Sequence, residues 1–112
     1  MEIKLNAKLT AYSQLNFKKL AQQNYLFETT IPTNWTGESA PFIQIVPVEG
    51  LLAQDDAQGI VDIVLSDNWE LAMKEDEQWA NIKIVTIENN QIKVYSDAII
   101  DIPLKIKIKV VR

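Results

Sequence analysis

The sequence contains no cysteine and no histidine among its 112 residues. Without cysteine there is no disulfide framework, no thiolate nucleophile and no sulfur ligand for a metal. Without histidine the chain lacks the side chain best suited to proton transfer near neutral pH, and the commonest metal ligand. These absences exclude Ser-His-Asp, Cys-His and histidine-based zinc chemistry in this chain. We therefore predict that the protein is not an enzyme, with no catalytic residues, no cofactor and no metal site.

Long hydrophobic runs are also absent. No apolar stretch approaches the ~20 residues that span a bilayer, and residues 1–9 alternate instead of forming the apolar core of a signal peptide. We therefore expect no membrane partner and no Sec-type export. A length of 112 residues fits one domain, and apolar and charged fractions of 47% and 23% are those of an ordinary globular chain.

The clearest periodicity in the sequence lies in residues 101–112. Apolar side chains occupy one parity and lysines the other: Ile102, Leu104, Ile106, Ile108 and Val110 against Lys105, Lys107 and Lys109. Successive side chains of a strand point to opposite faces, so this segment predicts a strand with one apolar and one cationic face. We expect the apolar face to complete a sheet begun by residues 82–96.

Five earlier segments are rich in β-branched and aromatic residues between turn-forming residues, and they predict further strands. They are residues 25–32, 42–49, 60–65, 82–88 and 91–96. Asn89 and Asn90 fit a two-residue hairpin turn, because asparagine tolerates positive φ. Pro47 cannot donate to a ladder, which favours an edge strand for residues 42–49.

One helix is predicted, over about residues 67–80. Asp67 is the expected N-cap, and Glu70 completes a capping-box pattern three residues later. The predicted fold is mainly β, a small antiparallel β-sandwich with this single α-helix packed on it. Residues 25–112 form the one β-rich domain, and residues 1–24 are an N-terminal strand or attachment arm.

Charge is unevenly distributed along the chain. Residues 1–24 carry four lysines and one glutamate, a net of +3; residues 25–80 carry eleven acids and one lysine, a net of −10; residues 81–112 have a net of +3. Such a distribution suits docking of the basic ends on the acidic middle, within one chain or between copies. It also suits an ordinary solvated surface. The acidic majority argues against nucleic-acid binding.

The acidic loop at residues 50–59 offers one candidate metal site. Asp55 and Asp56, with Asp62 nearby, supply oxygens of the kind calcium prefers, but the spacing does not match an EF-hand loop. Acids also cluster in the predicted helix. Paired carboxylates can hydrolyse a glycosidic bond, but only in a pocket that holds the two groups on either side of that bond. Solvated acids are the interpretation that we favour for both groups, and we leave the role of Asp55 and Asp56 open.

Three aromatic residues are candidates for contact with a partner or a glycan: Trp35, Phe42 and Tyr95. Aromatic rings pack against the apolar faces of sugars as well as in cores. We expect Trp69 and Trp79 to be core residues, because they share a helix that must bury one face. Trp35 lies in a polar loop, so docking on the body of the domain and contact with a partner remain equal alternatives.

The lysine stripe of the last strand also has two interpretations. Lys105, Lys107 and Lys109 fit subunit-contact charges that meet an anionic polymer or the acidic middle of a neighbouring copy. Lysines on an exposed edge strand also discourage unwanted strand pairing, and this second interpretation is the one we favour.

A family resemblance rests on a series of short motifs in a fixed order. They are Thr30-Ile31-Pro32, Trp35, Ser39-Ala40-Pro41-Phe42, Val48-Glu49-Gly50, residues 60–66, a helix ending near Trp79, residues 92–95, residues 101–106 and Lys109-Val110-Val111-Arg112. This order resembles small virion-structural domains of tailed phages and prophages of Gram-positive bacteria, and it covers residues 29–112. Such domains occur alone or at the ends of fibre, tail or head-appendage proteins.

The resemblance implies a non-enzymatic structural protein of the virion, either a fibre or appendage tip or a head decoration protein. It also implies a homotrimer, contacts with other virion proteins, and attachment to a host surface, with a glycan there as a further partner. The alternative function is a monomeric carbohydrate- or receptor-binding module that uses exposed aromatic residues around Trp35.

Overall fold

The computed structural model describes residues 23–112 of the chain. Eight elements follow one another: β1 (Asn24–Ile31), β2 (Phe42–Pro47), the 3-10 helix η1 (Ala53–Ala57), β3 (Ile60–Ile63), α2 (Trp69–Trp79), β4 (Ile82–Glu88), β5 (Gln91–Ser96) and β6 (Leu104–Val111). The arm or strand expected over residues 1–24 lies outside the described residues, apart from its last two.

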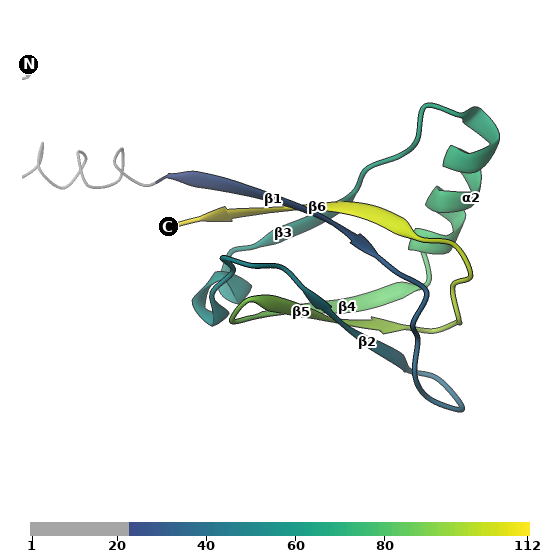
Figure 1. Cartoon of the computed structure of the whole chain (residues 1–112), viewed down its shortest axis with the longest axis horizontal. Helices are drawn as coiled ribbons and strands as arrows, with labels where there is room; N and C mark the ends of the chain where they lie inside the picture. The colour runs from purple at the N-terminus through teal and green to yellow at the C-terminus, as the bar shows by residue number, and fades with distance from the viewer. Residues whose placement is uncertain (1–22) are drawn as a thin grey trace, which may run out of the picture.

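The strands form two three-stranded sheets, of order β1-β6-β3 and β2-β5-β4, and every pairing is antiparallel. Figure 1 shows the two sheets facing each other, with α2 at one end of the sandwich and η1 at the other. The predicted fold class, a mainly β antiparallel sandwich with one α-helix, is confirmed. β2 is an edge strand, as Pro47 indicated.

The core lies between the two sheets and is built by alternation. Along β6 every second side chain is buried and the lysines between them are exposed, and β5 shows the same period. Because inward residues of both sheets meet face to face, a strand period of two is enough to build the core. The buried apolar residues are Ile31, Val46, Val48, Leu51, Ile87, Ile92, Val94, Ile100, Leu104, Ile106, Ile108 and Val110.

The place of β6 in the fold differs from the prediction. Its apolar face was expected to complete the sheet of residues 82–96, but β6 is the central strand of the other sheet, between β1 and β3. Eight residues of β1 pair with it, from Asn24 opposite Val111 to Ile31 opposite Leu104. Periodicity fixes which face of a strand is buried, whereas the partner strand depends on the connections. Edge protection therefore does not explain the lysines, because β6 has a strand on each side.

The helix is shorter than predicted and is capped one residue later. The side chain of Asn68, not that of Asp67, accepts the N–H of Leu71 at 2.9 Å. The predicted core role of the two helical tryptophans is half right. Trp79 packs against the core, but Trp69 is 76% exposed, because α2 stands at the end of the sandwich and meets it through its C-terminal end.

The one fully buried side chain of α2 is polar. Glu75 is 6% exposed, and its two carboxylate oxygens accept the backbone N–H of Ser66 at 2.8 Å and the Ser66 hydroxyl at 2.7 Å. A buried carboxylate is tolerated when its oxygens are hydrogen-bonded in this way. The contact ties the helix to the segment that precedes it.

No helix within residues 23–112 has the length and apolar character needed to cross a membrane.

Candidate functional site

The three aromatic residues proposed as a contact surface do not lie on one face. Trp35 is half-buried and packs against the core, and its buried indole Nε1 has no hydrogen-bond partner within the described residues. Phe42 has the parity of the buried residues Gln44 and Val46. Tyr95 has the opposite parity on β5 and points to the outer face of the same sheet. The geometry gives no single aromatic platform.

Tyr95 belongs to an apolar row that crosses the outer face of the β2-β5-β4 sheet. Ile43 pairs with Tyr95 on one side, and Ile84 pairs with it on the other. Ile84 is 53% exposed, and Ile45, two residues along β2, is 55% exposed. The Lys93 ammonium lies 5.5 Å from the centre of the Tyr95 ring, within cation–π range. This outer apolar row, defined as Ile43, Ile45, Ile84 and Tyr95, has no partner among residues 23–112.

Apolar side chains are also exposed at the helical end of the sandwich. Trp69 and Met73 are four residues apart and so share one side of α2, with exposed fractions of 76% and 52%. Ile99, in the loop between β5 and β6, is 59% exposed, and Figure 1 shows this loop at the same end as α2. Exposed apolar side chains scattered singly are normal on a protein surface, whereas larger groupings mark interaction sites.

The lysine stripe lies in the middle of the other sheet's outer face. Lys107 is opposite Glu28 of β1 and opposite Asp62 of β3. Lys105 and Lys109 are opposite uncharged residues, Thr30 and Leu26 on β1. Opposite charges on neighbouring strands stabilise a sheet by roughly 0.2–1 kcal/mol. The acidic middle of the sequence therefore supplies neighbours for the central lysine within the chain.

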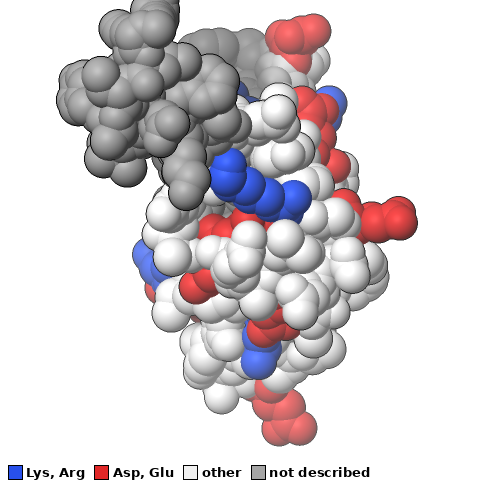
Figure 2. Space-filling model, turned by 90° about the vertical axis from the view of Figure 1, so that its left-hand side faces the viewer, with Lys and Arg blue, Asp and Glu red and all other residues white. Residues whose placement is uncertain are grey.

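Acidic and basic side chains are interspersed among uncharged ones on the side of the molecule that Figure 2 shows. Within the described residues, no group of three or more acidic side chains is arranged to hold a metal ion. The three aspartates weighed above as calcium ligands have separate contacts. Asp55 binds an arginine, Asp56 accepts the N–H of Ile87 at 2.7 Å, and Asp62 lies opposite Lys107.

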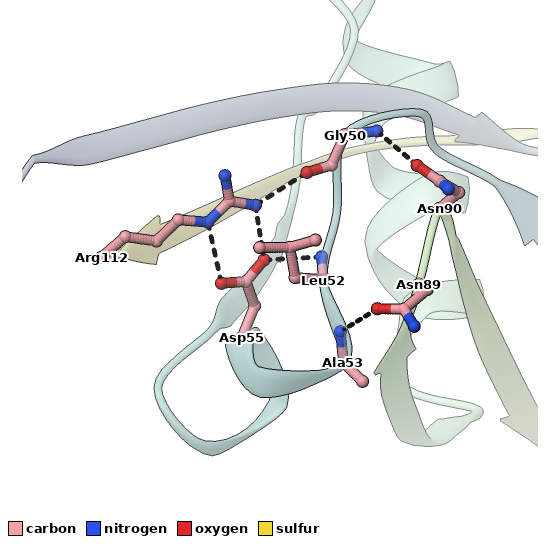
Figure 3. Close-up of polar contacts among 7 residues, drawn as sticks. All are labelled: Gly50, Leu52, Ala53, Asp55, Asn89, Asn90 and Arg112. Carbon is pink, nitrogen blue, oxygen red and sulfur yellow. Dashed lines mark hydrogen bonds and ion pairs between the residues drawn. The ribbon is translucent and has the colours of Figure 1, made fainter.

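The contact between Asp55 and Arg112 is the most developed polar site in the described chain (Figure 3). The guanidinium Nε donates to one carboxylate oxygen at 3.1 Å, and Nη2 donates to the other at 2.8 Å. The same Nη2 donates to the carbonyl of Gly50 at 2.7 Å. Such a two-point contact fixes orientation as well as charge. It joins the end of β6 to η1, 57 residues earlier.

The surroundings hold both charged groups in place. The Asp55 side chain is 1% exposed and that of Arg112 is 23% exposed. Asp55 also accepts the N–H of Leu52 at 2.9 Å, and the guanidinium carbon lies 4.8 Å from the centre of the Tyr25 ring. A buried charge that is paired and hydrogen-bonded in this manner is tolerated, so this site is a structural connection between η1 and the β1-β6-β3 sheet.

The hairpin turn between β4 and β5 anchors the same segment. The side chain of Asn90 accepts the N–H of Gly50 at 2.9 Å, and the side chain of Asn89 accepts the N–H of Ala53 at 2.8 Å. Asn90 has a φ of 63°, which fits the turn expected from the sequence. The two asparagines therefore form the turn and also hold η1 against the second sheet, a role that the sequence did not indicate.

The hydrogen bonds from Arg112 hold the pKa of the Asp55 carboxyl below its ordinary value of 3.8, although burial opposes the shift. A lowered folded-state pKa gives stability that is present above the unfolded value and is lost as pH falls through the folded value. We therefore expect wild type to lose its stability advantage over Asp55→Asn on acidification. Urea unfolding at about pH 6 and about pH 3 checks this, and an advantage that stayed constant would contradict it.

Comparison with known proteins finds no match to this chain among protein families, curated proteins or solved structures. The function is therefore inferred from the sequence and from the surfaces described above.

Proposed function

We propose that this protein is a non-enzymatic structural component of a phage or prophage virion, a fibre or appendage tip or a decoration protein that assembles through contacts between copies. The observation that carries the proposal is the outer apolar row on the β2-β5-β4 sheet. Two isoleucines there are more than half exposed, on the outer face of the sheet. Burial of apolar area is the dominant favourable term in most protein association.

The motif order described above supports a virion part in particular. It favours a homotrimer, and closed symmetric assembly is the usual form of such oligomers. The monomeric glycan-binding alternative receives less support, because the Trp35 ring is packed against the core. Localisation in the virion and contacts with other virion proteins belong to the same proposal.

A charge placed in the outer apolar row should weaken assembly. Ile45→Lys puts an ammonium on the outward face of β2, where a subunit contact would have to bury it, and burying an unpaired charge is costly. We expect wild type to elute with the mass of three chains and Ile45→Lys to shift toward the mass of one, as measured by light scattering.

The matched control is Ser39→Lys, which adds the same charge to an exposed loop and should leave the mass unchanged. Circular dichroism of both variants shows whether the fold is retained. A wild-type protein that remains strictly monomeric at all concentrations would refute assembly as the function.

A further inference from the structure

A groove opens between the free edges of the two sheets. It is lined by Val61 of β3 and the preceding Gly59, by Trp79 of α2, and by residues 82–85 of β4. Its volume is about 260 Å³, below the roughly 300–1,000 Å³ usual for small-molecule sites. The groove is therefore small for a cofactor.

The backbone of β4 is unpaired on the side that faces the groove. β4 is an edge strand, and its Ile87 N–H leaves the sheet to reach Asp56 at 2.7 Å. Alternate residues of a strand direct their backbone groups to the same side, so the N–H and C=O of Val85 also point off the edge. β4 has no second strand partner within the described residues, and Asp56 occupies only the Ile87 end of the edge.

β3 forms the opposite wall of the groove, and its backbone is also unpaired on the side that faces away from β6. The N–H of Val64 donates to the Lys105 carbonyl of β6 at 2.8 Å, so residues of the other parity, including Val61, turn their backbone groups away from β6. The N–H of Ile63 is satisfied by the Asp62 side chain at 2.9 Å. Two open strand edges therefore border one groove, and their free backbone N–H and C=O groups are what an added strand satisfies.

We propose that residues 2–10 of a second copy of this chain bind in the groove as an added strand along β4. This inference rests on the proposed function and names the segment through which copies are joined. Residues 2–10 alternate between polar and apolar side chains, with Ile3, Leu5, Ala7 and Leu9 on one parity. In an added strand that parity faces Val61, Val85 and the Trp79 ring, and the other parity faces solvent.

Charge favours the same pairing. The polar parity of the segment carries Lys4 and Lys8, and residues 1–24 have a net charge of +3. The helix whose last residue lines the groove carries four acids and one lysine, a net of −3. Complementary charges of this kind direct association and fix which partner binds.

The described chain begins on the side of the β1-β6-β3 sheet away from the groove. Gln23 and Arg112 exchange two backbone hydrogen bonds of 3.1 Å, so the pairing of β1 with β6 extends to the first described residue. β1 lies on the far side of β6 from β3 and the groove. Its own groove is therefore two strands away from that point, and the proposed assembly makes the groove of a second copy the site that we infer.

The first test compares two glutamate substitutions in the full chain. Leu5→Glu places a charge on the parity that enters the groove, and Asn6→Glu places the same charge on the solvent parity. We expect the mass measured by light scattering to fall to that of one chain for Leu5→Glu and to stay at the wild-type value for Asn6→Glu.

The second test uses the absence of cysteine from the sequence. A chain carrying Leu5→Cys is mixed with a chain carrying Lys83→Cys, at the rim of the groove, and oxidised. We expect a covalent heterodimer at a yield about tenfold above that of a control in which Lys105→Cys replaces Lys83→Cys, because docking raises the local concentration of the two thiols. Lys105, on β6, is also an exposed lysine.

The outcomes separate this inference from the proposed function. A wild-type oligomer that is insensitive to Leu5→Glu, with no excess of heterodimer, overturns the strand-addition inference and leaves assembly intact. A monomeric wild type overturns both. A cross-link that forms only within one chain carrying both cysteines also overturns the inference, because it places the segment in its own groove.

Discussion

Replacing Asp55 by alanine should lower the free energy of unfolding by about 2–3 kcal/mol, because removing one partner of a buried ion pair leaves the other uncompensated. The carboxylate is almost fully buried and accepts three hydrogen bonds, two from Arg112 and one from the backbone of Leu52. Alanine leaves that N–H without its partner and the guanidinium with the Gly50 carbonyl alone. The effect should fall below the usual range for buried pairs, because Arg112 is 23% exposed and regains some water.

Thermal unfolding followed by circular dichroism measures this loss, and we expect the midpoint to fall by about 10 °C. Asp101→Asn is the matched control, since Asp101 is an exposed acid in the loop before β6 and should change the midpoint little. Equal shifts for Asp55→Ala and the control would contradict a structural role for the Arg112 contact.

Asp55 shows why this part of the molecule was not predictable from its sequence. The residue was assigned to a solvated acidic loop, because aspartates in a polar stretch are usually exposed. Its partner is 57 positions away, and no local pattern connects residue 55 with residue 112. The one signal in the sequence is that Arg112 is the only arginine. It follows a predicted strand whose polar positions are otherwise occupied by lysines.

The strands were predictable because their information is local. A period of two defines the inner and outer residues of β5 and β6, and the observed burial follows it. The arrangement of strands into sheets is not local, which explains the error over β6. The hairpin of β4 and β5 was predicted correctly because its turn is contained in two asparagines.

The helix also shows that local structure was predictable and its packing was not. Its existence followed from residue composition and spacing, but the face that it buries did not. Trp69 and Trp79 have the same chemistry and lie on one helix, yet only Trp79 packs against the core. What decides between them is the position of α2 at the end of the sandwich, where Glu75 is held by Ser66. That position is set by connections and by packing between layers.

Replacing Ile106 by alanine should cause the largest loss of stability that we predict, about 3–4 kcal/mol. Ile106 is fully buried at the centre of β6, where it is opposite Thr29 of β1 and Ile63 of β3. Alanine removes apolar atoms from the middle of the core, and a central strand held on both sides cannot shift to fill the space. Chemical denaturation followed by tryptophan fluorescence measures the loss.

The comparison that decides the role of β6 is Lys107→Ala, one residue further along the strand. Lys107 points to the outer face between Glu28 and Asp62, so its replacement removes charge pairs worth less than about 1 kcal/mol each. A large loss for Ile106→Ala beside a small one for Lys107→Ala shows that the strand acts through its apolar face. If Lys107→Ala were as destabilising as Ile106→Ala, the charge of Lys107 between two acids, rather than core packing alone, would hold the sheet together.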